Sequence, residues 1–563
     1  MAAAPAWLPT FASSKWFDTL NLVVSLGSLF VVAAMSLVFA LEKLGAGSWL
    51  RCGQCRAKGA PRGDDDAGTK TADAGVSLVA VCVEEEARRG DVSPRDTSPF
   101  EIQSPQPPQP PPQQPQPPQP RLLYLDNIKW MLIEVVVLHH VACVLNGAFA
   151  CIGIGLFPTP VGPGEGNDAL FVLQTFSFWF MGLNQSYFMA LFFFISAYFS
   201  PSSLDRKGAW VFLQDKFWRL GVPLTVCAFL LYPAIDKAIF KTLQPELRVW
   251  VDPPYAPTTD QLWFVFWLLV FNLVYLGCAL IRARMTKRDK QEEKTSPPAT
   301  APRPKAPALL LPVLYFLAVW IGVSVCQACL AILGLDHGTA SWGELFNNAT
   351  FWNMPMYVTY FVGGILAKRH DWLTAFATMD CKLVWMARAG SLVGAFLPSI
   401  CPLWSCFRPG CGAVLPSWKA VQARLDATGA NFFVTSPGLF FNFFGLAFTV
   451  VLLHDAPKYL NFTNRFSRFM ARSAYTTYII HIWFIQLATV SFAYILGATS
   501  EISALRWTNL ASEEDSGVTP ATAEEVGAWK PWVALLYIVA VVNVVVWPLA
   551  YALAVAPGLR TML

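Results

Sequence analysis

Charged residues are scarce in this chain of 563 residues: they make up 14%, whereas hydrophobic residues make up 55%. Soluble domains normally carry about 25% charged residues, so this composition excludes an ordinary soluble protein. It indicates a protein that crosses a membrane several times. The net charge of +4 says little by itself, because its distribution along the chain matters more, and no nucleic-acid partner is predicted.

Signals for metal binding and for internal duplication are also missing. Cys52 and Cys55 form a CxxC pair, but no second pair lies within zinc-binding spacing. We therefore expect no metal site. We detect no internal repeat, although inverted repeats are frequent in transporters.

The first apolar segment, residues 17–41, does not have the features of a secretory signal, whose apolar part is short and follows a basic flank. This segment is 25 residues long, and Lys43 and Arg51 come after it. The pattern favours an uncleaved membrane anchor with the N-terminus outside.

Eleven apolar segments are long enough to cross a hydrocarbon layer about 30 Å thick. We therefore predict an all-α, polytopic transmembrane helix bundle with a ten-helix core and one N-terminal anchor helix. The segments are centred on residues 17–41, 128–147, 182–199, 217–234, 261–282, 308–334, 351–367, 383–402, 435–454, 472–498 and 531–556. The predicted regions are an N-terminal segment (1–44), a linker (45–120), a membrane domain (121–556) and a tail (557–563).

Lysine and arginine are concentrated in alternate loops, and positively charged loops remain on the cytosolic side of a membrane. The basic set is therefore predicted to be cytosolic, so the ten core helices begin and end in the cytosol. The basic set consists of residues 200–219, 282–307, 368–382, 455–472 and 557–563, with 20 lysines and arginines. The other set consists of residues 148–181, 235–260, 335–350, 403–434 and 499–530, with eight.

The linker at 45–120 cannot form a hydrophobic core. It ends in QSPQPPQPPPQQPQPPQP (residues 103–120), which would reach roughly 55 Å as a polyproline II helix. This segment is either a ligand for a proline-binding domain or a tether between anchor and core. We favour the tether, because proline-rich spacers arise easily.

The first core helix carries the strongest candidates for chemistry, Lys129 and His140. Eleven helical residues make three turns plus about 20°, so both side chains share one face. Ionisable residues inside a membrane are costly and are usually functional. Burial disfavours the imidazolium form, so we expect His140 to be neutral and able to accept a proton. Asp126 is expected to precede the helix, cap its amides and pair with Lys129.

Each of these residues also has a purely structural interpretation. Asp126 would be an ordinary helix cap, Lys129 a lysine that extends to the membrane surface, and His140 a histidine that only packs. His139 lies about 100° around the helix and is assigned that packing role. Glu134 is expected to pair with another helix.

Two further groups are weaker candidates. Lys216 and Arg219 in KFWR lie at a cytosolic helix entrance and suit phosphate binding, although any cytosolic boundary carries such cations. Tyr478 and His481 are three residues apart in another span and share a helix face.

Together these residues resemble the acyltransferase type 3 family of integral membrane proteins. The opening motif of that family, LDxxR/K followed by histidine, is matched by Leu125, Asp126, Lys129 and His140; its RxxR is matched by Lys216 and Arg219. FFFISAYFSP (192–201), LWFVFWLLVF (262–271), YFVGGILAKRHDWL (360–373) and SAYTTYIIHIWFI (473–485) match further blocks in order. The chain departs from the family at Ala197, where glycine is usual, at Lys216, where arginine is usual, and at Ile482, where proline is common.

The resemblance implies transfer of an acyl group, often acetyl, from cytosolic acyl-CoA to the hydroxyl of a carbohydrate, lipid-linked or other acceptor presented from the opposite face of the membrane. Acyl-CoA would be a donor substrate, with no resident cofactor. Lys129, Lys216 and Arg219 would lie near the CoA phosphates, His140 would act as base or acyl carrier, and Tyr478 and His481 would line the substrate site.

Two alternatives remain open for the function of the chain. One is a transporter of an anion or a proton along the Lys129–His140 face. The other is a non-catalytic scaffold that binds partners through residues 103–120. In either case we expect a multi-pass protein of the plasma membrane or an endomembrane.

Overall fold

The structure is a computed structural model. It describes residues 122–145, 155–157, 168–235, 238, 259–292, 309–332, 353–400, 438–496, 502–503 and 529–560. The predicted anchor (17–41), the linker (45–120) and its proline-rich end lie outside the described residues.

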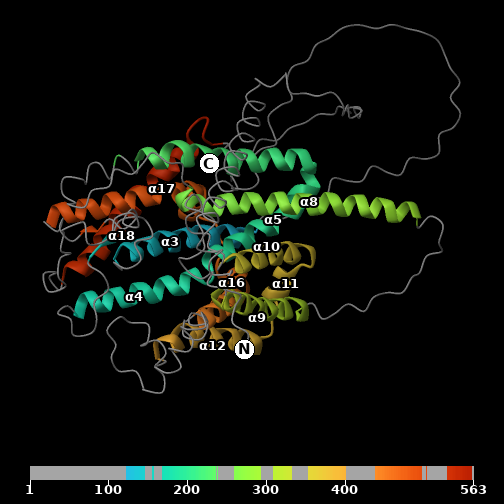
Figure 1. Ribbon diagram of the computed structural model, residues 1–563, viewed down its shortest axis with the longest axis horizontal. Coiled ribbons are helices and arrows are strands. Elements are labelled where there is room, and N and C mark those ends of the chain that lie inside the picture. The colour runs from blue at the N-terminus through green and yellow to red at the C-terminus, as the bar shows by residue number, and fades with distance from the viewer. Residues whose placement is uncertain are drawn as a thin grey trace, which may run out of the picture.

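Within the described residues the chain is almost entirely helical, as the sequence predicts (Figure 1). The long helices are α3 (Leu123–Leu145), α4 (Asp168–Gln185), α5 (Phe188–Lys216), α8 (Trp263–Glu292), α9 (Leu310–Ile332), α10 (Met354–Arg369), α12 (Cys381–Ile400), α16 (Gly438–Tyr459), α17 (Arg465–Leu496) and α18 (Lys530–Val555). Shorter helices are η1 (Phe217–Gly221), α6 (Val222–Val226), η2 (Cys227–Leu231), η3 (Asp260–Leu262) and α11 (Trp372–Ala377), and two-residue strands are β1 (Gly155–Leu156) and β2 (Ile502–Ser503).

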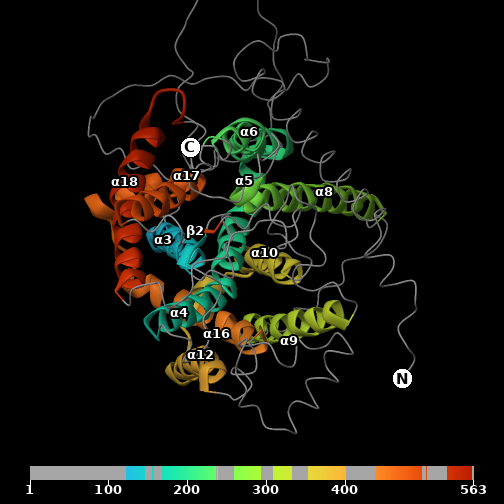
Figure 2. The same ribbon diagram turned by 60° about the vertical axis from the view of Figure 1, so that its left-hand side comes forward.

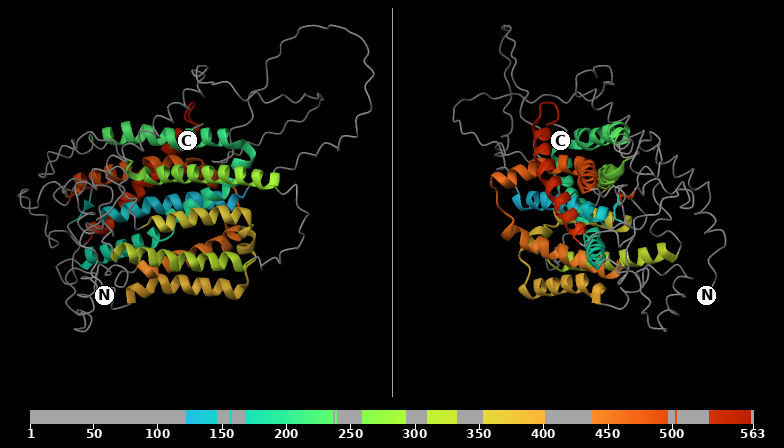
Figure 3. Two further views of the ribbon diagram at one scale, coloured as in Figure 1. Left: turned by 45° about the vertical axis from the view of Figure 1, so that its right-hand side comes forward. Right: turned by 90° about the vertical axis from the view of Figure 1, so that its left-hand side faces the viewer.

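The long helices lie side by side with roughly parallel axes and form one bundle (Figure 3, left). Helix α3 lies inside this bundle and packs against α4, α5, α16, α17 and α18 (Figure 2). Its hydrophobic side chains are mostly buried. This is expected, because a helix that is hydrophobic on all sides is found in the interior of a bundle. The helical-bundle prediction is therefore confirmed.

Five stretches of the described residues are long and apolar enough to cross a membrane. The predicted spans at 182–199 and 217–234 both fall in one of them. Four other predicted spans form α9, α10, α12 and α16, so these segments are helical as expected; the number of ten crossings stays a prediction. The five stretches are Leu123–Leu145, Asp168–Ile235, Trp263–Thr286, Arg465–Ile495 and Lys530–Val555.

The segment around residue 185 differs from the prediction. We expected a loop at 148–181 and one helix at 182–199, whereas α4 already begins at Asp168 and the helix is broken at Ser186. Helix α16 passes close to this break: a Cβ atom on Gly445 would overlap the Ser186 carbonyl oxygen. The polar run Asn184, Gln185 and Ser186 interrupts the apolar sequence at the same place.

Helices α5 and α10 also approach each other closely. A Cβ atom on Gly364 would overlap the Phe194 carbonyl oxygen and would lie 2.8 Å from the Cβ atom of Ala197. The alanine that replaces the family's usual glycine at position 197 is therefore accommodated by a glycine on the facing helix. Local packing at Ala197 thus depends on Gly364.

Contacts at the two ends of the bundle agree with the predicted grouping of the loops. The strands β1 and β2 pair antiparallel, with Gly155 opposite Ser503, and join two loops of the set predicted to be external. The side chain of Asn127, at the start of α3, donates hydrogen bonds to the carbonyl oxygens of Leu460 (2.6 Å) and Phe462 (2.8 Å). That contact joins the start of α3 to a loop of the set predicted to be cytosolic.

Candidate active site

Two histidines from distant parts of the chain meet inside the bundle. His140 lies in α3 and His481 in α17, and Nε2 of His481 is 3.1 Å from Nδ1 of His140. Their ring centroids are 5.0 Å apart. The sequence predicts both as site residues but does not predict that they touch. The pair therefore connects two neighbouring helices at the centre of the bundle.

Backbone carbonyl groups fix the proton positions on the two rings when both are neutral. Nδ1 of His481 is 2.8 Å from the Tyr478 carbonyl oxygen, and Nδ1 of His140 is 2.8 Å from the Val136 carbonyl oxygen. A carbonyl oxygen only accepts hydrogen bonds, so each Nδ1 carries the proton and each Nε2 the lone pair. Nδ1–H of His140 then donates to Nε2 of His481. The lone pair of His140 is on Nε2, the atom that would act as a base.

The two rings differ in accessibility. His481 is completely buried, whereas 7% of the surface of His140 is exposed. Of the two, only His140 retains surface that another molecule could touch. The pair therefore has an inner member, His481, and an outer member, His140.

His139 lies next to the pair but has a different environment. Its ring packs against Phe188 of α5 with centroids 5.0 Å apart. Its Nδ1 atom is buried and has no hydrogen-bond partner among the described residues. The packing of His139 against a neighbouring helix is as expected, but the hydrogen bond from Nδ1 that such a histidine would make is not found among the described residues.

Asp126 and Lys129 form an ion pair near the start of α3, with Nζ 3.2 Å from Oδ1. The prediction that Asp126 precedes the helix is wrong, because α3 begins at Leu123 and Asp126 lies in its first turn. The helix extends further than the apolar run because Tyr124 and Leu125 are buried as well. A carboxylate at this position is still stabilised by the helix dipole.

Lys129 shares its end of the bundle with a second lysine that the sequence does not single out. Nζ of Lys129 lies 4.9 Å from the centroid of the Phe199 ring, and Nζ of Lys368 lies 5.2 Å from that of Tyr198. The Tyr198 and Phe199 rings are themselves edge to face, 5.3 Å apart. Two cations from α3 and α10 therefore lie over neighbouring rings of α5. Lys368 is part of the YFVGGILAKRHDWL block, which is the signal that could have identified it.

The predicted phosphate-binding group at Lys216 and Arg219 contains an acidic residue. Nε of Arg219 is 3.3 Å from Oδ1 of Asp215, and Oδ2 of Asp215 is 3.0 Å from Nζ of Lys207. Nζ of Lys216 lies 5.2 Å from the centroid of the Phe212 ring. Two cations thus pair with one carboxylate and a third lies over an aromatic ring, which leaves a net positive cluster.

The backbone at Arg219 is π-helical, in the turn η1 (Phe217–Gly221). Such turns leave a carbonyl group that the regular helix would have used, and they are frequent at functional sites. The hydroxyl of Tyr475, on α17, donates to the Arg219 carbonyl oxygen at 3.0 Å. The cationic segment is thereby attached to the helix that carries His481.

Tyr478 is buried, and its hydroxyl group donates to the backbone carbonyl of Gln261 in η3. Its own carbonyl oxygen accepts from Nδ1 of His481. Tyr478 therefore joins α17 to the start of α8 and holds the inner histidine. Its predicted contact with the substrate stays a prediction.

Glu134 has the partner on another helix that the sequence predicts without identifying it. The indole N–H of Trp547, on α18, donates to Oε2 of Glu134 at 2.9 Å and also to Oδ1 of Asn543 at 3.0 Å. This carboxylate therefore contributes to the packing of α3 against α18.

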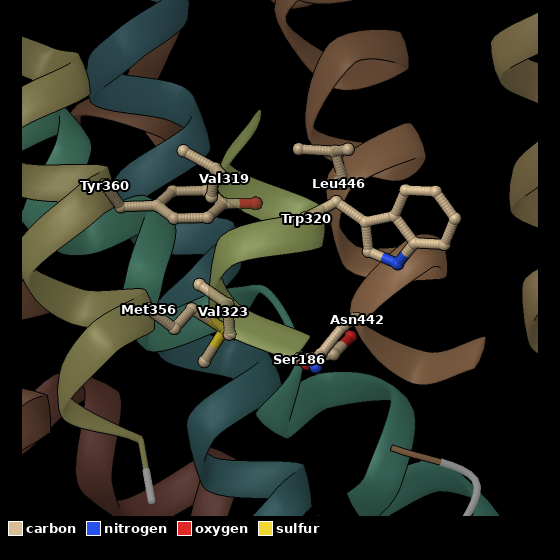
Figure 4. Close-up of a pocket in the computed structure, with 8 residues that line it drawn as sticks. All are labelled: Ser186, Val319, Trp320, Val323, Met356, Tyr360, Asn442 and Leu446. Atoms are coloured by element: carbon tan, nitrogen blue, oxygen red, sulfur yellow. The ribbon is translucent and has the colours of Figure 1, made fainter. Parts of the chain in front are cut away.

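A small pocket lies away from the histidine pair, between α9, α10, α16 and the turn that joins α4 to α5 (Figure 4). Its lining is mostly apolar, with polar groups from Ser186, Tyr360 and Asn442. Neither His140 nor His481 lines it, so we assign it no part in the site. In the part of the chain that the structure describes, no cluster of three or more His, Cys, Asp or Glu residues is arranged to hold a metal.

Comparison with known families gives a match that covers most of the chain. The family described as "Acyltransferase domain", of acyltransferase type 3, matches residues 122–551. No curated protein and no solved structure matches the chain. The matched region contains every site residue described above. The chain is therefore a membrane protein that belongs to the acyltransferase type 3 family.

Proposed function

We propose that this protein transfers an acyl group, in particular acetyl, from acyl-CoA in the cytosol to a hydroxyl group of a carbohydrate or a lipid-linked acceptor. His140 acts as the general base. The observation that carries the proposal is the position of its imidazole, which is buried in the bundle with Nδ1 2.8 Å from the Val136 carbonyl oxygen, so that in the neutral ring the proton is on Nδ1 and the lone pair on Nε2. A general base needs a lone pair within hydrogen-bond reach of the proton that it takes, and in this tautomer that lone pair is on Nε2.

In the proposed reaction, Nε2 of His140 takes the proton of the acceptor hydroxyl as the oxygen attacks the acyl carbon. A C–O bond forms, the C–S bond breaks, and its electron pair leaves with the CoA sulfur. The proton on Nε2 then passes to that thiolate, so the base is regenerated. No oxidant, metal or additional reactant is required.

The anionic donor would bind at the end of the bundle that carries the cations. Lys129 and Lys368 lie over neighbouring rings there. Lys207 and Arg219 pair with Asp215, and Lys216 lies over the Phe212 ring. Arginine and lysine side chains suit phosphate recognition. This end is the predicted cytosolic side, where acyl-CoA is present.

The proposal is tested with membranes from cells that express the chain, incubated with radiolabelled acetyl-CoA. We expect label to appear in membrane glycans or lipids. His140→Ala should reduce the rate by roughly 100- to 10,000-fold, which is the usual contribution of a general base.

The matched control is His139→Phe, which alters the neighbouring histidine but preserves an aromatic ring against Phe188. We expect this variant to retain wild-type transfer. Acyl transfer at the wild-type rate by correctly folded His140→Ala protein would contradict the proposal. Folding is checked by gel-filtration profile and thermal stability in detergent.

A further inference from the structure

We propose that His481 is a positioning residue, which holds the His140 imidazole in the orientation that directs Nε2 toward the acceptor hydroxyl. This role differs from the substrate-binding role that the sequence predicts for His481. The inference rests on the proposed function and extends it to a second residue.

The first argument is that the polar atoms of His481 are engaged within the protein. Nδ1 lies 2.8 Å from the Tyr478 carbonyl oxygen and 3.2 Å from that of Thr477, and Nε2 lies 3.1 Å from Nδ1 of His140. The residue is also completely buried. A donor or acceptor molecule therefore meets His140 and not His481.

The second argument concerns how many acceptors Nδ1–H of His140 has. The Val136 carbonyl oxygen is four residues earlier in the same helix, where it also accepts the backbone N–H of His140. Nε2 of His481 is an acceptor that the α3 backbone does not use. Because the outer torsion of histidine is broad and nearly two-fold, the Val136 carbonyl oxygen alone leaves the ring free to tilt, and a second acceptor on another helix restricts it further.

The third argument comes from the charge that develops during the reaction. When Nε2 of His140 takes the proton, the ring becomes positively charged and its Nδ1–H donates to Nε2 of His481 as a charge-assisted bond. Such bonds are roughly twice as strong as neutral ones. An interaction that strengthens in the transition state raises kcat and leaves substrate binding unchanged. His481 keeps its own proton on Nδ1 throughout.

Two substitutions of His481 separate the bond to His140 from the other contacts. In His481→Gln, the amide oxygen reaches approximately the position of Nε2 and can accept from His140. In His481→Asn, the shorter amide can still donate to the Tyr478 carbonyl oxygen but does not reach His140. Both variants keep a polar amide at this position, which makes them a matched pair.

The assay follows release of the CoA thiol from acetyl-CoA, with a membrane glycan extract as the source of acceptor. We expect His481→Asn to lower kcat by about 10- to 100-fold, which corresponds to loss of a hydrogen bond to a charged group. KM for acetyl-CoA should stay within about twofold. His481→Gln should retain kcat within about fivefold of wild type, because it restores the acceptor.

An unchanged kcat in the asparagine variant would overturn the inference. So would a raised KM with unchanged kcat, or equal losses in folded glutamine and asparagine variants. If the asparagine variant does not fold, His481→Ala replaces it, with the same expected loss. The proposed function can be refuted independently. It is wrong if His140→Ala is as active as wild type. If His140→Ala is inactive and His481→Asn is normal, only the role of His481 is wrong.

Discussion

Gly364→Ala tests the packing that holds α5 against α10, and its effect can be worked out from the structure. The new methyl group would overlap the Phe194 carbonyl oxygen and lie 2.8 Å from the Cβ atom of Ala197. Overpacking costs about 1–3 kcal/mol, and occasionally more. We expect the upper part of this range, because a backbone oxygen inside a helix cannot turn away as a side chain could.

The assay is the apparent melting temperature of the detergent-solubilised protein. The entropy of unfolding grows with chain length, so one kcal/mol shifts Tm by about 1 °C in a chain of 563 residues, and we expect a decrease of roughly 2–3 °C. The control is Gly277→Ala, in α8, where a new Cβ atom meets nothing within 4 Å. Alanine is more favourable than glycine inside a helix by about 0.5–1 kcal/mol, so the control should be neutral or slightly stabilising.

A second substitution at the same contact makes the test more specific. Ala197→Gly combined with Gly364→Ala removes the contact between the two Cβ atoms but leaves the contact with the Phe194 carbonyl oxygen. We therefore expect partial recovery of Tm in the double variant. A Gly364→Ala protein as stable as wild type would refute this account of the α5–α10 contact.

Three further predictions follow from other contacts. Arg219→Ala should raise KM for acetyl-CoA by about 10- to 100-fold with little change in kcat, because a charge-assisted contact to phosphate is lost; an unchanged KM would contradict this. Trp547→Phe removes the indole donor to Glu134 and should lower the free energy of unfolding by about 1–3 kcal/mol. The double variant with Glu134→Gln should recover part of this loss, which a comparison of the Tm values of the two variants measures. Asn348 in NAT and Asn461 in NFT are sequons for N-glycosylation, and only the first lies in a loop predicted to be external. Asn348→Gln should therefore abolish a mass shift on glycosidase treatment and Asn461→Gln should not; the reverse result would invert the orientation.

The helices were largely predictable from the sequence. A membrane-spanning segment must be long and apolar, and its backbone N–H and C=O groups must form hydrogen bonds within the segment. The break at Ser186 was not predicted, although the polar run Asn184, Gln185 and Ser186 lies there. Asparagine and serine are disfavoured inside helices, but a run this short does not show by itself that an apolar segment divides into two helices. The close approach of α16 at Gly445 is a tertiary contact, which composition does not reveal.

The site was predictable as a set of residues but not as an arrangement. The spacing of Lys129 and His140 on one helix is a local property, and the ion pair of Asp215 with Arg219, four residues apart, follows from helix geometry. The contact between His140 and His481 joins residues 341 positions apart. No periodicity connects them, and the isoleucine at position 482 gave no reason to weight His481 more strongly.

The pairing of Lys207 with Asp215 shows another limit of reasoning from spacing. Eight residues along a straight helix place two side chains about 12 Å apart along the axis, whereas here Nζ and Oδ2 are 3.0 Å apart. Gly208 explains the difference, because its φ of 73° interrupts the helix between them. A positive φ is readily adopted by glycine, but the sequence alone does not show that this glycine adopts it.

Acyl transfer and transport are separated most directly in liposomes that contain the purified protein, membrane glycans and acetyl-CoA labelled in the acetyl group. The account predicts that wild-type protein releases free CoA and labels the glycans, and that His140→Ala protein does neither. Accumulation of label inside the liposomes without consumption of acetyl-CoA would contradict it.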